Sequence, residues 1–188
     1  MKEKLSKLKI KISVITSVII MLFMLCNASI ADNLKDKEAF FKTKIKLAFI
    51  YKFIEFIDGD WDFATADNEV IISVYGNFTN EELEMLMNYS LKKVKNTPIK
   101  IQYNPNIKNS KNSDIVFFTK GSDAKIAKIL RNTRKDILSI GDINYFTDKG
   151  GVIELSEYRG KLRFKIDNEG AKKRGIMFNA KLLELSER

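Results

Sequence analysis

The sequence contains no histidine, and its only cysteine is Cys26, near the N-terminus. Without histidine, the chain has no Ser-His-Asp or Cys-His catalytic group, no histidine-based zinc site and no imidazole to transfer protons. Without a second cysteine it forms no internal disulfide. Its stability therefore depends on a packed core, and 188 residues are enough to build one.

The N-terminus carries a cluster of lysines followed by an apolar run. Five lysines occur within residues 2–11, and residues 12–25 are almost entirely apolar. Residues 29–31 then place serine and alanine at the −3 and −1 positions of a cleavage site. This order predicts a cleavable signal peptide over residues 1–31 and export of a single domain, residues 32–188, to the periplasm.

Two alternatives to cleavage are a retained membrane anchor and a lipoprotein. The apolar run is shorter than the roughly 20 residues that a membrane span needs. A lipoprotein would use Cys26, but Leu25 before it is larger than the residues expected there. Cleavage is therefore the favoured interpretation.

Charge argues against a nucleic-acid partner. Removal of residues 1–31 takes away five lysines and one glutamate, which lowers the formal net charge from +9 to +5. The remaining lysines are scattered and form no arginine-rich block. Export and weak charge patterning together predict no nucleic-acid binding.

The segment from Lys44 to Ile57 is strongly apolar. Wound as a helix at about 100° per residue, it gathers Lys44, Lys52 and Glu55 into one narrow wedge. Its apolar residues spread over roughly 240° of the circumference, interrupted only by Lys46, whereas a surface helix has a stripe of about 100° or somewhat more. Two interpretations stay open: a core helix covered on two sides, or a helix with one side facing a dimer or another partner.

Strands and helices alternate after this segment. A Thr79-x-x-Glu82 capping box predicts one helix, and Ser122 is predicted to cap another. The β-branched and apolar runs predict buried strands, and one alternating run predicts a half-buried or edge strand. The predicted buried strands are residues 69–75, 115–118 and 136–140, and the alternating strand is 99–103.

This alternation predicts an α/β fold with a single domain. Near-continuous β-branched strands are typical of parallel sheets that helices cover. We therefore predict a mainly parallel central sheet flanked by helices on both faces. Residues 151–155 and 161–166 alternate around Arg159-Gly160, which predicts a C-terminal antiparallel hairpin. A turn over residues 168–175 and a last helix over 179–185 complete the prediction.

No residue pattern marks a catalytic or metal site. Gly150 and Gly151 lack the strand-loop-helix context of a phosphate-binding loop and are expected to let the backbone turn into the hairpin. Asp142 and Asp148 lack calcium-loop spacing. We therefore predict a binding protein with no catalytic residues, no metal and no cofactor.

Several segments recur in the order and spacing of a known family. They are KLAFIYKFIEFI at residues 46–57, ILSIGD at 137–142, LRFKI at 162–166 and KLL at 181–183. They resemble the KAAFLYNFAKFVEW-, LTVGD-, RFEIN- and SKLL-type segments of the YfiR-like family, also called the domain of unknown function 4154. The likeness covers nearly all of residues 40–187.

The resemblance implies an exported regulatory α/β protein. The best-known role in the family is periplasmic repression of a membrane diguanylate cyclase, which lowers cyclic-di-GMP output and biofilm formation. The implied partner is therefore such a cyclase or a related sensor protein, with a homodimer as a further expectation. A small-molecule sensor that binds its ligand at the carboxyl ends of the parallel strands is the alternative function.

The chain departs from the family pattern at several positions. Relatives often have cysteines where Ser73 and Ser113 stand, so redox control through that pair is absent. The usual Glu-Ile-Asn reads Lys-Ile-Asp at residues 165–167, which reverses a charge. The usual Trp-Pro after the first helix is missing, and Trp61 follows a few residues late.

We expect the partner or dimer interface on the part of the first helix that one sheet cannot bury, and on the charged face of the hairpin's second strand. The candidate residues are Phe49, Phe53, Phe56, Trp61, Arg163 and Lys165, with Gly150 and Gly151 as structural residues.

Overall fold

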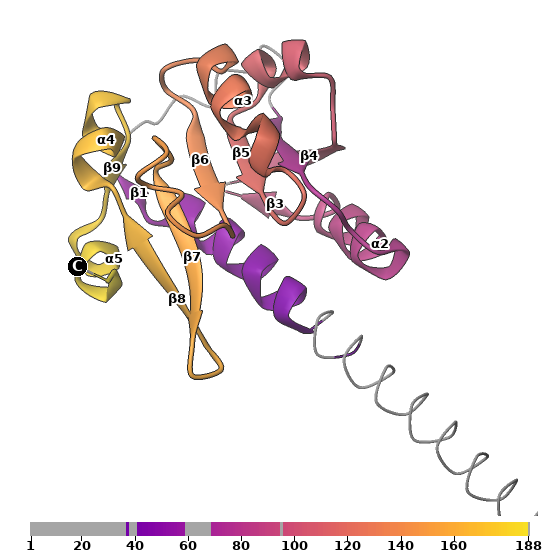
Figure 1. Cartoon of the computed structure of the whole chain (residues 1–188), viewed down its shortest axis with the longest axis horizontal. Helices are drawn as coiled ribbons and strands as arrows, with labels where there is room; N and C mark the ends of the chain where they lie inside the picture. Colours follow the sequence, from indigo (N-terminus) through magenta and orange to yellow (C-terminus); the bar gives the residue numbers. More distant parts are fainter. Residues whose placement is uncertain (1–36, 38–40, 59–68, 95, 188) are drawn as a thin grey trace, which may run out of the picture. The chain divides into compact units, whose positions relative to one another are not determined.

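The computed structural model describes residues 37, 41–58, 69–94 and 96–187 (Figure 1). The chain divides into two compact units, residues 1–42 and residues 43–188. The second unit contains all the strands described below. The predicted signal peptide and Trp61 lie outside the described residues.

The described residues of the second unit form a seven-stranded sheet with the order β3-β4-β2-β5-β6-β7-β8. The inner strands pair in parallel, while β3 and β8 pair antiparallel to their neighbours at the two edges. The predicted α/β fold with a mainly parallel sheet and a C-terminal hairpin is therefore confirmed. The strands are β2 (Val70–Tyr75), β3 (Lys93–Val94), β4 (Thr97–Tyr103), β5 (Ile115–Phe118), β6 (Leu138–Gly141), β7 (Ile153–Tyr158) and β8 (Lys161–Ile166).

Side chains alternate between two cores on the two faces of the sheet. On β5, Ile115 and Phe117 join the larger core, whereas Val116 and Phe118 join the smaller one. This alternation follows from the pleat of a strand, which sends successive side chains to opposite faces. Strands buried on both faces must be apolar throughout, which explains their near-continuous β-branched sequences.

The first helix spans residues 41–55, and its residues from 47 onwards pack in the larger core together with α2 (Asn80–Tyr89). Contacts with the sheet, α2 and the C-terminal elements bury Leu47, Ile50 and Ile54. The wide apolar arc is therefore covered from more than one side. The predicted capping box of α2 is present, because Thr79 accepts from the Glu82 amide and Glu82 accepts from the Thr79 amide.

The first helix ends at residue 55, before the end of the apolar segment at Ile57 and before the end near Asp58 that its pattern predicts. Ile57 and Asp58 form β1 (Ile57–Asp58), which pairs antiparallel with β9 (Met177–Phe178). A strand partner about 120 residues away along the chain takes these two residues out of the helix. Local helical periodicity contains no information about such a distant partner.

The smaller core lies beneath the 3₁₀ segments η1 (Ile107–Asn112) and η2 (Asp123–Lys125) and the helix α3 (Ile126–Asn132). Ile126 and Ile129, three residues apart on one face of α3, are buried here. Ser122 is the N-cap residue of η2, but the predicted side-chain cap is absent, because its hydroxyl donates to the Thr119 carbonyl at 2.6 Å. Helices cover both faces of the sheet, as predicted.

The C-terminal region differs from its prediction in one element. Arg159 and Gly160 both have positive φ, which is the backbone geometry of a two-residue hairpin turn. Residues 168–175 were predicted as a turn, but α4 (Asn168–Lys173) forms there, capped by the Asp167 carboxylate that accepts from the Gly170 amide. The last helix is α5 (Ala180–Leu185), within the predicted range. None of the described helices has the length and hydrophobicity that crossing a bilayer requires.

Candidate functional site

The predicted interface residues on the first helix differ in exposure. Phe53 is 1% exposed, and its ring contacts that of Phe164 with centroids 5.2 Å apart. Phe49 and Phe56 are only partly buried, and the Phe49 ring lies 5.9 Å from that of Phe53. Phe53 is therefore a core residue, and Phe49 and Phe56 are the two that keep some accessible surface.

The hairpin strand β8 presents a basic outer face. Arg163 and Lys165 are exposed, while Phe164 between them is buried. The Lys165 amine pairs with the Asp148 carboxylate at 3.5 Å. Because the two basic side chains alternate with Phe164, they share the face of β8 that points away from the core.

The two glycines before the hairpin occupy different environments. Gly150 has φ of +92°, and a methyl group there would meet nothing within 4 Å. A methyl group on Gly151 would lie 2.0 Å from the Phe146 ring. Gly150 therefore provides a backbone conformation, and Gly151 provides space for the ring.

Lys46, the one charge in the apolar arc of the first helix, pairs with Asp142 directly after β6. The exposed fractions of the two side chains are 19% and 17%, so the ion pair is largely covered. Thr119, after β5, donates to the same carboxylate at 3.5 Å. This contact places a helix charge inside an otherwise apolar surface and joins the helix to the carboxyl ends of two strands.

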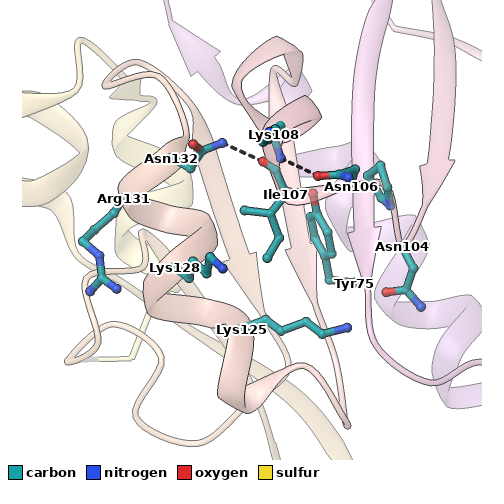
Figure 2. Close-up of a pocket in the computed structure, with 10 residues that line it drawn as sticks. Tyr75, Asn104, Asn106, Ile107, Lys108, Lys125, Lys128, Arg131 and Asn132 are labelled. Carbon is teal, nitrogen blue, oxygen red and sulfur yellow. Dashed lines mark hydrogen bonds between the residues drawn. The ribbon is translucent and has the colours of Figure 1, made fainter.

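A cleft of about 660 Å³ opens on the other face, beside the carboxyl ends of β2 and β4 (Figure 2). One wall is the segment from β4 to η1, and the other wall is η2 and α3. Tyr75, the last residue of β2, lies between them. The lining residues are Tyr75, Asn104, Pro105, Asn106, Ile107, Lys108, Lys125, Lys128, Arg131 and Asn132.

The asparagine side chains of the cleft hold its backbone. Asn104 accepts from the Gly76 amide at 3.1 Å and donates to the Gly76 carbonyl at 2.9 Å. Asn106 accepts from the Lys108 amide, and Asn132 donates to the Ile107 carbonyl (Figure 2). These bonds fix the shape of the wall and use most of its neutral polar groups.

The hydroxyl of Tyr75 is buried and has no hydrogen-bond partner of good geometry among the described residues. Burial raises the pKa of Tyr75, and this effect outweighs the opposite influence of the nearby Ser110 and Ser73 hydroxyls. The group therefore stays protonated at neutral pH and remains a hydrogen-bond donor.

Ser73 and Ser113 lie together in the same buried region. Their hydroxyl oxygens are 2.7 Å apart, and both residues are 0% exposed. These are the positions at which the family resemblance places cysteines in relatives. In this chain, a hydrogen bond between two hydroxyls joins Ser73 of β2 to Ser113, which lies just before β5.

The sequence placed a possible ligand site at the carboxyl ends of the parallel strands. It named none of the residues that line the cleft, because residues 104–112 were interpreted only as a loop. Among the described residues, no group of three or more His, Cys, Asp and Glu side chains is placed to hold a metal ion.

The mainly parallel sheet with helices on both faces defines a three-layer α/β domain. The family described as DUF4154, YfiR/HmsC-like, matches residues 43–187. The chain therefore belongs to the YfiR/HmsC-like family, as its sequence resemblance predicts. This is a regulatory, non-catalytic family known for periplasmic regulation of diguanylate cyclases.

A solved structure of a conserved domain protein from Vibrio cholerae is similar in fold, with a TM-score of 0.52 and 10% sequence identity. The similarity covers 77% of this chain and 58% of the Vibrio chain, so the present chain spans less than two thirds of that structure. A search of curated proteins found no match.

Proposed function

We propose that this chain is an exported regulatory protein that represses a membrane-bound diguanylate cyclase, or a related sensor, by binding its periplasmic region. The observation that carries the proposal is the family match over residues 43–187, which includes every described strand. The lysine cluster, apolar run and cleavage sequence of residues 1–31 support export. The absence of histidine from the sequence is consistent with binding rather than catalysis.

The mechanism is a shift of an equilibrium between two states of the cyclase. A protein that binds the inactive state more tightly than the active state favours the inactive state by its difference in binding free energy. A hundredfold preference corresponds to about 2.7 kcal/mol. Any signal that lowers the affinity for the inactive state then restores activity.

We place the partner surface on the outer face of β8 and on the accessible parts of the first helix. Arg163 is exposed and has no ion-pair partner among the described residues, so it is free to meet an acidic group. Phe49 and Phe56 supply apolar area next to the core, and Trp61 follows the same helix in sequence. Aromatic and arginine side chains are the residue types that carry most of the binding energy in protein interfaces.

The test is a charge reversal on this face. Arg163→Glu is expected to weaken co-purification with the cognate cyclase and to raise cellular cyclic-di-GMP. The matched control is Lys173→Glu, an exposed residue of α4 with the same change in charge. If both variants bind the cyclase as tightly as the wild type does, the partner surface lies elsewhere.

Export has a separate test. N-terminal sequencing of the protein recovered from the periplasmic fraction is expected to begin at Asp32. A chain that retains Met1 in the membrane fraction would instead indicate an uncleaved anchor. Light scattering of the mature protein measures whether it forms the proposed homodimer.

The cleft between η1 and α3 favours a second candidate function, a periplasmic sensor of a small molecule. It lies at the carboxyl ends of β2 and β4, where ligands of open α/β sheets bind. The two candidates are compatible, because a ligand in the cleft and a partner on β8 would occupy different residues. Thermal stabilisation of the purified protein by a metabolite panel tests this candidate without the cyclase.

A further inference from the structure

The cleft lies where the sheet connections diverge. From β2 the chain passes through α2 to β4 on one side of β2, and from β4 it crosses to β5 on the other side. Two connections that leave a sheet in opposite directions leave a crevice between them, here outside the carboxyl end of β2. Tyr75 at the end of β2 is at this point.

The polar side chains of the cleft that are not already hydrogen-bonded to the backbone are almost all positively charged hydrogen-bond donors. Asn104 bonds twice to Gly76, and the side-chain oxygen of Asn106 is used by Lys108. The charged lining residues are Lys108, Lys125, Lys128 and Arg131, and no lining residue is Asp or Glu. In Figure 2, Lys125 extends from the η2–α3 wall towards Asn104, whereas the Arg131 guanidinium points away from Tyr75.

These lysines differ from several others in the domain. The amines of Lys52, Lys100 and Lys172 each pair with a carboxylate at 2.6–3.3 Å. Lys108, Lys125 and Lys128 have no such partner within the described part of the chain. Like charges gathered around one concave surface repel each other, and an anion between them removes that repulsion.

The size and walls of the cleft limit what it can hold. A volume of about 660 Å³ falls within the roughly 300–1,000 Å³ of small-molecule sites and is far larger than an inorganic ion requires. Ile107, Pro105 and the Tyr75 ring give it an apolar base. A ligand that fits has an organic body and several anionic oxygens.

We propose that this cleft binds a small organic anion with two or more negative charges, held by Lys125 and Lys128 and seated against Tyr75 and Ile107. The inference deepens the second candidate function, on which it rests, and does not depend on repression of a cyclase. Phosphate esters and polycarboxylates share this chemistry, and the experiment below distinguishes them.

The experiment is isothermal titration calorimetry of the mature chain at low ionic strength. The probes are a nucleoside monophosphate, inorganic pyrophosphate, citrate and, as an uncharged comparison, glucose. We expect at least one organic anion to bind and its affinity to fall as salt is added. Binding of the nucleotide assigns a phosphate ester, and binding of citrate alone assigns a polycarboxylate.

The variant Lys125→Gln/Lys128→Gln tests the location. Loss of two charged donors is expected to weaken binding by at least about tenfold. The control Lys173→Gln/Lys181→Gln removes the same charge from exposed residues of α4 and α5 and is expected to change affinity less than about twofold. All four side chains are exposed, so both variants are expected to fold.

Three results overturn the inference. They are the absence of binding by every anion, equal weakening in the two double variants, and binding of pyrophosphate with no organic anion. If an uncharged metabolite from the panel binds in the cleft instead, the sensor function stands and the anion inference fails. Cyclase repression is measured with Arg163→Glu and is unaffected by any of these results.

Discussion

The buried hydroxyl pair of Ser73 and Ser113 leads to a quantitative prediction. Two oxygens 2.7 Å apart on fixed backbone place the β-carbons within reach of a disulfide. The double variant Ser73→Cys/Ser113→Cys is therefore expected to form that bond without moving β2 or β5. The mature chain has no other cysteine, because Cys26 lies in the predicted signal peptide.

The magnitude follows from the length of chain that the bond closes. A loop of about 40 residues loses enough entropy in the unfolded state to stabilise the fold by about 4 kcal/mol. Loss of the hydroxyl–hydroxyl bond removes about 1 kcal/mol of that gain. A net gain of about 3 kcal/mol corresponds to a rise in Tm of roughly 6–12 °C for a domain of this size.

The assay compares the oxidised and reduced forms of the same variant by thermal unfolding. Free-thiol titration reports whether the disulfide has formed, and the reduced form serves as the control for the two substitutions. The reasoning is refuted if the thiols stay free under oxidising conditions. It is equally refuted if the oxidised form unfolds at or below the temperature of the reduced form.

Three further predictions concern packing and burial. Gly151→Ala places a methyl group against the Phe146 ring and should lower the free energy of unfolding by more than about 2 kcal/mol, whereas Gly150→Ala, with open space around it, should cost about 1 kcal/mol from its positive φ; denaturant unfolding compares the two, and equal costs would contradict the packing argument. Phe164→Ala removes a buried ring that contacts two rings of the first helix and should cost about 3–5 kcal/mol, which the same unfolding experiment measures. Tyr75→Phe should leave stability at pH 7 within about 0.5 kcal/mol of the wild type, because the hydroxyl it removes has no hydrogen-bond partner of good geometry among the described residues. Because the pKa of Tyr75 is raised in the folded state, its protonated form contributes stability that is fully present below the ordinary pKa of 10.0 and is lost as the pH rises towards the folded-state pKa. The wild type should therefore lose more stability than Tyr75→Phe at alkaline pH. A loss of equal size in both proteins would show that the pKa of Tyr75 does not change on folding.

The partner surface connects the fold to the proposed function. The rings of Phe53 and Phe164 contact each other in the core. Replacing either residue would therefore weaken binding indirectly, because it would destabilise the domain. Arg163 is exposed and can be changed without that consequence, whereas Phe56 is partly buried against the core. A binding experiment on this protein is therefore informative at exposed positions and ambiguous at the buried aromatic ones.

Much of the architecture was available from local sequence patterns. Buried strands such as Val70–Tyr75 are predicted by runs of β-branched residues, because both of their faces are covered and must be mostly apolar. The Thr79 capping box and the Arg159-Gly160 turn are also predictable from sequence, because their interactions span three residues or fewer.

Only the tertiary structure decided the features that join distant segments. Ile57 leaves its helix to pair with Phe178, and Lys46 tolerates an apolar surface because Asp142 neutralises it. The cleft combines residues 104–108 with residues 125–132, which the order of the strands brings to opposite sides of Tyr75. Periodicity and capping report on residues within one or two turns of each other, whereas these contacts depend on which strands become neighbours, and that is settled by the packing of the whole sheet.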